Sequence, residues 1–104
     1  MKLALVFALL LGAKERGILI GKWRTVDKPV TVEFMANGKL TVKKGDGQLV
    51  RGTYKWIDDT HMSVDIRYDP KRPFVDTLKV FLMENRLDTT DSKGNVDRLE
   101  RIRE

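Results

Sequence analysis

The fold is indicated most clearly by residues 50–68, which read VRGTYKWIDDTHMSVDIRY. In the first half of this stretch, Val50, Tyr54 and Trp56 alternate with polar or charged residues. The second half alternates in the same way and has its apolar side chains at Met62, Val64, Ile66 and Tyr68. A period of two residues is typical of a strand with one buried face, and the turn-forming pair Asp58-Asp59 separates the two runs. The stretch therefore predicts two successive β-strands.

The same period continues outward in both directions. It predicts further strands over residues 18–26, 30–34, 39–43, 77–83 and 87–89. Turns are expected where conformationally permissive or strand-breaking residues gather, at residues 37–38, 45–47, 69–73, 84–85 and 91–95. Gly52, inside a predicted strand, indicates a bend or a close backbone approach. The pattern predicts an all-β domain, an antiparallel up-and-down meander of about eight short strands.

The element over residues 96–103 has two interpretations. Val96, Leu99 and Ile102 recur at every third residue, which suits a helix capped by Asn95. The alternative is a bulged strand that closes the sheet, because the preceding strands need a partner for their free edge. We prefer the closing strand.

The first seventeen residues differ in composition from the rest. Lys2 is followed by a nine-residue apolar run, Leu3–Leu11, and then by small and charged residues. This order is typical of a secretory signal peptide, and the run is too short to span a bilayer. The sequence therefore divides into a hydrophobic leader over residues 1–17 and a domain over residues 18–104. It favours an exported protein of the periplasm, the cell envelope or the extracellular space.

The cleavage signal in this leader is imperfect. Ala13 suits the position before a cut, but Leu11 stands where a small residue is expected. The alternative is a retained N-terminal helix that packs on the domain or on a neighbouring chain. Membrane contact is expected only through residues 3–11, and only if they are retained.

Composition limits the chemistry that the chain can perform. The 104 residues include no cysteine, which excludes disulfides, thiolate metal sites and a cysteine nucleophile. The 20 basic and 15 acidic residues give a net charge of +5, but they are interspersed along the chain. A nucleic-acid surface would cluster them on one face, so we expect a mixed-charge surface and no nucleic-acid partner.

Three motifs suggest a family resemblance. They are Gly21-Lys22-Trp23, then Val32-Glu33-Phe34 followed by Asn37-Gly38-Lys39, and Gly52-Thr53-Tyr54. Together they resemble the lipocalin-like small β-barrel domains of bacterial exported proteins and lipoproteins. The resemblance covers about residues 18–103 and implies a structural role for Gly21. It also implies that Trp23 closes the base of the barrel under a late arginine, for which Arg101 is the first candidate and Arg98 the second.

The chain offers one set of candidate ligand-binding side chains. These are the large side chains expected on the inner face: Trp23, Phe34, Tyr54, Trp56, Met62, Ile66 and Tyr68. The competing interpretation is that they fill the core, because an eight-stranded barrel has only enough interior for its own side chains. We favour the core, and the short strands argue against a deep ligand cup.

Catalytic and metal chemistry find little support. His61 is the single histidine and lies near Asp58 and Asp59, whereas a metal site needs several converging ligands and a hydrolase needs a nucleophile with an oriented base. We expect no catalysis, no cofactor and no metal. The sequence predicts a non-catalytic exported domain that binds a small apolar ligand or a protein partner. The alternative is a structural subunit that uses its retained hydrophobic N-terminus for assembly.

Overall fold

The computed structural model describes residues 17–68 and 71–103. These residues form eight β-strands: β1 (Gly21–Thr25), β2 (Val30–Phe34), β3 (Lys39–Lys44), β4 (Leu49–Trp56), β5 (His61–Ile66), β6 (Phe74–Leu82), β7 (Arg86–Thr90) and β8 (Val96–Arg101). The expected hydrophobic helix of the leader lies outside the described residues.

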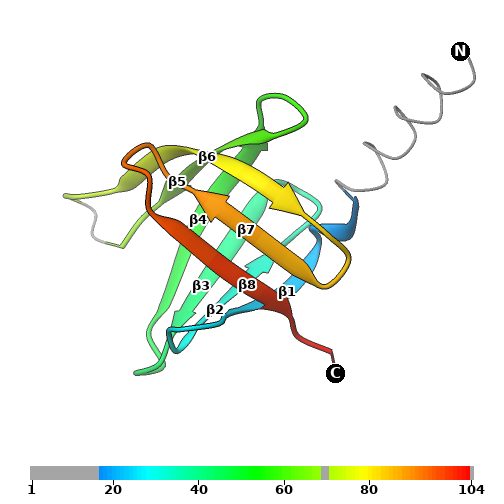
Figure 1. Cartoon of the computed structure of the whole chain (residues 1–104). Helices are drawn as coiled ribbons and strands as arrows, with labels where there is room; N and C mark the ends of the chain where they lie inside the picture. The colour runs from blue at the N-terminus through cyan, green and yellow to red at the C-terminus, as the bar shows by residue number, and fades with distance from the viewer. Residues whose placement is uncertain (1–16, 69–70, 104) are drawn as a thin grey trace, which may run out of the picture.

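The strands form a closed barrel (Figure 1). Each strand pairs antiparallel with the strand that follows it in the chain, and β8 pairs antiparallel with β1. Among the described residues, closure gives every strand two neighbours, although the first half of β6 extends beyond its ladder with β7, and this limits edge-to-edge aggregation. The all-β, up-and-down prediction is confirmed.

The last element is the closing strand. β8 pairs with β7 from Arg86↔Glu100 to Thr90↔Val96 and with β1 from Trp23↔Arg101 to Thr25↔Leu99, with no extra residue on either side. The helical alternative and the expected bulge are therefore both wrong. The three-residue spacing suggested one buried helix face, but the two apolar residues lie on opposite faces of the strand: Leu99 faces the core and Val96 faces outward.

Two strands, β1 and β6, begin three residues from their predicted starts. β1 starts at Gly21 because the preceding residues form a turn, in which the Ile20 amide donates to the Gly17 carbonyl (3.3 Å). β6 starts at Phe74, directly after Pro73, where Phe74 pairs with Ile66. Apolar side chains occur on both faces of β6, where Val80 is buried and the outward-facing Phe81 is 60% exposed.

The core consists of the inward-facing side chains of the strands and one residue of the N-terminal turn. Its buried members are Leu19, Trp23, Phe34, Leu40, Val42, Val50, Met62, Val64, Ile66, Val80, Leu87 and Leu99. Gly52 also lies on the inward side, and a Cβ placed on it would lie 2.6 Å from the Asp65 carbonyl oxygen. The glycine therefore permits the close approach of β4 and β5 that its position in the sequence predicts.

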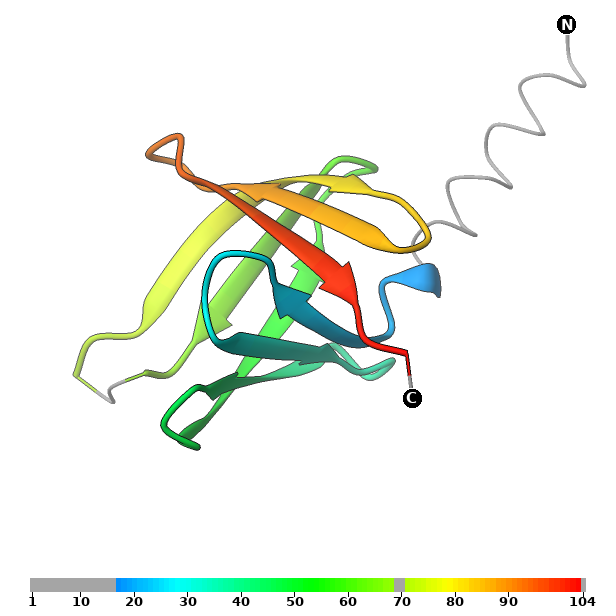
Figure 2. The ribbon, with the colours of Figure 1, turned by 60° about the horizontal axis from the view of Figure 1, so that its bottom comes forward.

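The two ends of the barrel differ. We call the end with the β1–β2, β3–β4, β5–β6 and β7–β8 loops the open end. The opposite end, the closed end, carries the N-terminal turn and the other three loops. Figures 1 and 2 both show the N-terminal turn beside the β6–β7 loop and the end of β8.

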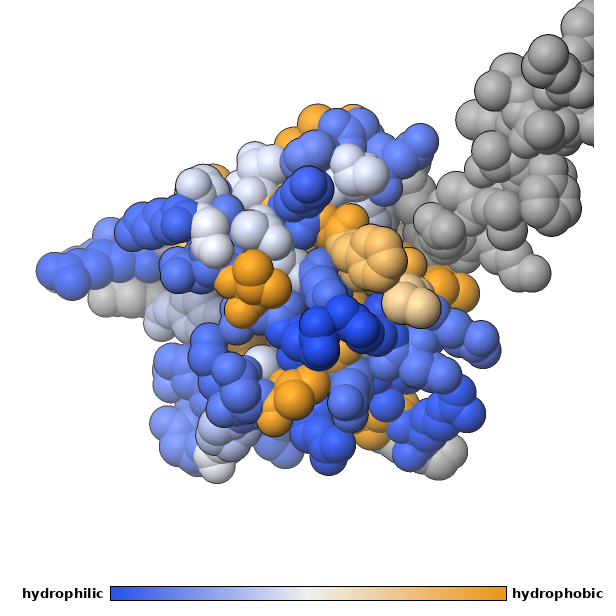
Figure 3. Space-filling view, in the orientation of Figure 1, coloured by the Kyte–Doolittle hydropathy of each residue, from blue (hydrophilic) through white to orange (hydrophobic). Residues whose placement is uncertain are grey.

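The outer surface is mainly polar. Figure 3 shows one face on which hydrophilic residues predominate and the hydrophobic ones form small separate patches. On β7 and β8, Asp88 accepts hydrogen bonds from Arg86 (2.8 Å) and Arg98 (3.1 Å), and the bond from Arg86 contributes most to lowering the pKa of this carboxyl.

Among the described residues, no helix has the length and apolar character needed to cross a membrane.

Candidate functional site

The barrel encloses a cavity of about 300 Å³. This volume lies at the lower end of the range for ligand pockets, roughly 300–1,000 Å³. Apolar side chains form most of its wall: Val30, Val32, Phe34, Leu40, Val42, Val64, Ile66, Phe74, Leu78, Leu87 and Leu99. The polar residues that line it are Thr25, Lys28, Tyr68, Thr89, Asp91, Asn95 and Asp97.

Most of these polar residues lie at the open end and form the mouth of the cavity. The Lys28 ammonium group is 3.0 Å from an Asp97 carboxylate oxygen, which ties the β1–β2 loop to β8. This hydrogen bond is the main cause that raises the pKa of Lys28. Burial, and then the negative charge of Asp97, raise the pKa of Tyr68. The cavity thus has an apolar interior and a polar, charged mouth.

The wall between β6 and β7 is incomplete near the mouth. These strands pair from Lys79↔Thr90 to Leu82↔Leu87, so the first half of β6 extends beyond the ladder. Asp76 bridges the gap, because one of its carboxylate oxygens accepts hydrogen bonds from the Ser92 amide (3.1 Å) and hydroxyl (3.0 Å). The Ser92 amide is the main cause that lowers the pKa of Asp76. The Asp76 side chain therefore connects β6 to the β7–β8 loop where β6 and β7 are not paired.

The closed end is plugged by Trp23. The indole is fully buried and donates from Nε1 to the Leu19 carbonyl oxygen (2.9 Å). The Arg101 guanidinium lies over the ring, 4.4 Å from its centroid. The same guanidinium donates to the carbonyl oxygens of Ile18, Ile20 and Glu84.

Gly21 completes this plug. Its φ of +131° is a conformation that favours glycine, and a Cβ placed on it would lie 2.9 Å from the Arg101 guanidinium. Gly21, Trp23 and Arg101, which the family resemblance singled out, therefore lie together at the closed end.

The structure divides the candidate ligand-binding residues into two groups. Phe34, Ile66 and Tyr68 line the cavity, whereas Trp23, Tyr54, Trp56 and Met62 do not. Of the second group, Trp23 and Met62 are fully buried, and the Tyr54 hydroxyl donates to the Met35 carbonyl oxygen. Strand alternation identifies which side chains point inward but not how far along the barrel axis each one lies.

Sequence reasoning missed the polar residues of the mouth. The inward orientation of Thr25 and Thr89 could have been predicted, because each lies two residues after an inward-facing apolar residue, Trp23 and Leu87 respectively. Lys28 and Asp97 had none, since they are 69 residues apart in the sequence and only closure of the barrel brings them together.

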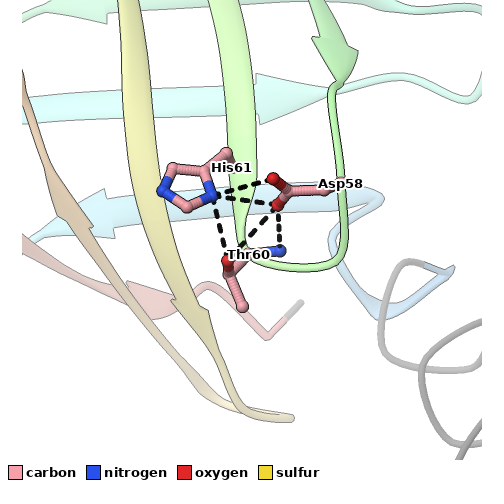
Figure 4. A network of polar contacts seen from close by, with 3 residues as sticks. All are labelled: Asp58, Thr60 and His61. Atoms are coloured by element: carbon pink, nitrogen blue, oxygen red, sulfur yellow. Dashed lines mark hydrogen bonds and ion pairs between the residues drawn. The ribbon is translucent and has the colours of Figure 1, made fainter.

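The single histidine is the first residue of β5, directly after the β4–β5 turn at the closed end (Figure 4). His61 Nδ1 is 2.9 Å from an Asp58 carboxylate oxygen and 3.0 Å from the Thr60 hydroxyl. The backbone N–H of Thr60, followed by His61, lowers the pKa of Asp58. A Ser-His-Asp type triad places the carboxylate and the hydroxyl on opposite ring nitrogens, whereas here both contact Nδ1. We interpret the group as a network that stabilises the turn.

Among residues 17–68 and 71–103, no group of three or more potential metal-ligating side chains gathers around a common point. Comparison with protein-family models gives no match for this chain, and no curated protein matches it either. The cavity is therefore the feature from which a function can be argued.

Proposed function

We propose that the protein is a non-catalytic binding domain that holds a small, largely apolar ligand in the barrel cavity. The observation that carries the proposal is the cavity itself, which is apolar in its interior, polar at its mouth and plugged at the opposite end by Trp23. Convergence of a few polar groups on a concave apolar site is typical of small-molecule sites. The resemblance to lipocalin-like exported domains favours the same function.

The size of the cavity limits the ligand. Its volume of about 300 Å³ is at the small end of the range for ligand pockets, roughly 300–1,000 Å³. A short hydrocarbon chain or a one- or two-ring compound fits this description. A polar group on such a ligand would lie at the mouth, beside Lys28, Tyr68 and Asp97.

We expect the neutral, polarity-sensitive fluorescent dye prodan, a two-ring naphthalene compound, to bind the protein saturably at one site. Val64→Phe fills the cavity with a larger side chain and should weaken this binding about tenfold or more. The matched control is Val80→Phe, since Val80 is also buried but does not line the cavity. Fluorescence titration of both variants, with circular dichroism to verify folding, measures the difference.

Leu78→Phe is a second filling variant at a less buried position of the wall. Equal weakening by Val64→Phe and Val80→Phe would contradict binding inside the cavity. Absence of saturable dye binding would contradict ligand binding in the cavity and favour the alternative, a structural subunit.

We further propose that the protein is exported and that the leader is removed after Ala13. The proposal rests on the basic start, the apolar run Leu3–Leu11 and the small residues that follow it. Intact-mass measurement of the native protein from envelope and extracellular fractions should show a chain that begins at Lys14. A mature protein that retains Met1 would contradict cleavage and favour the retained-helix alternative.

A further inference from the structure

A second hollow lies on the outer surface of the barrel, over strands β3, β4 and β5. We call it the outer depression. Its volume is about 350 Å³, and its wall consists of Lys39, Arg51, Gly52, Thr53, Asp65 and Arg67. None of these residues lines the inner cavity, so the two sites are separate.

Two arginines lie directly opposite each other at this site. Gly52 pairs with Ile66, and the Arg67 amide donates to the Arg51 carbonyl oxygen (3.1 Å), so Arg51 and Arg67 are cross-strand neighbours on the outward side. Like charges at directly opposite positions destabilise a sheet.

A third positive charge lies beside this pair. Lys39 on β3 is opposite Thr53, which places it diagonally from Arg51. Side chains at diagonal positions are about 7–8 Å apart at their backbones, within reach for long residues. The depression therefore gathers three basic side chains and one threonine hydroxyl.

The local carboxylate neutralises only part of this charge. Asp65 pairs with Arg67 at 3.0 Å and is the single acidic residue of the wall. Within residues 17–68 and 71–103, Lys39 and Arg51 form no ion pair. The depression is thus a surface hollow with uncompensated positive charge.

We propose that the outer depression binds a phosphate-type tetrahedral oxyanion, with Arg51 and Lys39 as its principal ligands. An arginine fork matches the geometry of such an anion, and a lysine adds a compact point charge. The Thr53 hydroxyl supplies a further donor, and Arg67 adds positive charge at the opposite wall. An anion between the arginines would also relieve their repulsion. This site is independent of the ligand proposed for the cavity.

The test is a titration of the folded protein with sodium phosphate, followed by NMR at constant ionic strength balanced with sodium chloride. We expect saturable shifts of the backbone amides around Arg51, Thr53 and Arg67. Arg51→Gln and Lys39→Gln should each weaken phosphate binding about fivefold or more. Lys79→Gln on β6 is the matched control, because it removes the same charge from an exposed position outside the depression.

Arg51→Gln also has a readout in the absence of phosphate. Because this change removes the repulsion between Arg51 and Arg67, the thermal midpoint should stay the same or rise. Shifts that grow linearly with phosphate, or equal weakening by Lys79→Gln, would overturn the proposal. Saturable phosphate binding that is unchanged in Val64→Phe would support an anion site in the outer depression, even if the cavity bound no ligand.

A second arm distinguishes the source of the anion. Co-sedimentation is measured with phosphatidylcholine vesicles that contain or lack phosphatidic acid, whose headgroup is a phosphomonoester. Binding to free phosphate alone assigns the site to a soluble anion, and Arg51-dependent binding to the phosphatidic acid vesicles assigns it to a lipid headgroup. Vesicle binding that Arg51→Gln and Lys79→Gln weaken equally reflects net charge only and would overturn the proposal for lipid.

Discussion

Replacement of Trp23 with alanine is expected to lower the free energy of unfolding by about 4 kcal/mol, within the range for large aromatic residues removed from a core. The indole is fully buried, and its Nε1 donates to the Leu19 carbonyl oxygen. The truncation would leave a void under Arg101 and remove both the hydrogen bond and the contact between cation and ring.

Urea denaturation followed by circular dichroism measures this loss. Trp56→Ala is the control, because Trp56 is only partly buried and packs at the edge of the core. We expect the control to lose less than half as much stability as Trp23→Ala. Similar losses for both variants would show that Trp23 has no special role in the plug.

Arg101→Met is expected to destabilise the barrel by about 3 kcal/mol, since a hydrogen bond to a charged group contributes about 1.5–3 kcal/mol and a cation–π contact about 0.5–2 kcal/mol. The substitution keeps much of the side-chain length but leaves the carbonyl oxygens of Ile18, Ile20 and Glu84 without their donor. The N-terminal turn should then separate from the closed end.

The control for this variant is Arg24→Met, which removes an exposed arginine whose nearest carboxylate, on Glu100, is 4.0 Å away. We expect a change below about 0.5 kcal/mol for the control. Hydrogen exchange of the Trp23 indole N–H should accelerate in Arg101→Met but not in Arg24→Met. An unchanged indole exchange rate would contradict the role of Arg101 in holding the plug.

The strands could be predicted from sequence because one face of each is buried. Met62, Val64 and Ile66 alternate without interruption and are all buried, and the structure places β5 there. The last strand was harder, because only Leu99 of the three apolar residues Val96, Leu99 and Ile102 is buried. Its identity as a strand follows from the closure of the barrel, which is a property of the whole sheet.

The cavity could be predicted only in part. Alternation assigns Phe34 and Trp23 alike to the interior, yet one lines the cavity and the other plugs the closed end. Position along the barrel axis depends on the register of every strand. The outer depression could not be predicted from the sequence, since Arg51 and Arg67 become neighbours only through the pairing of β4 with β5.

The bond between Arg101 and Ile20 joins residues 81 positions apart. A nascent chain cannot form it, or the β1–β8 ladder beside it, until β8 has left the ribosome. During synthesis β1 therefore lacks β8, the second of its two neighbouring strands. Completion of the barrel requires a long-range loop closure, which slows folding.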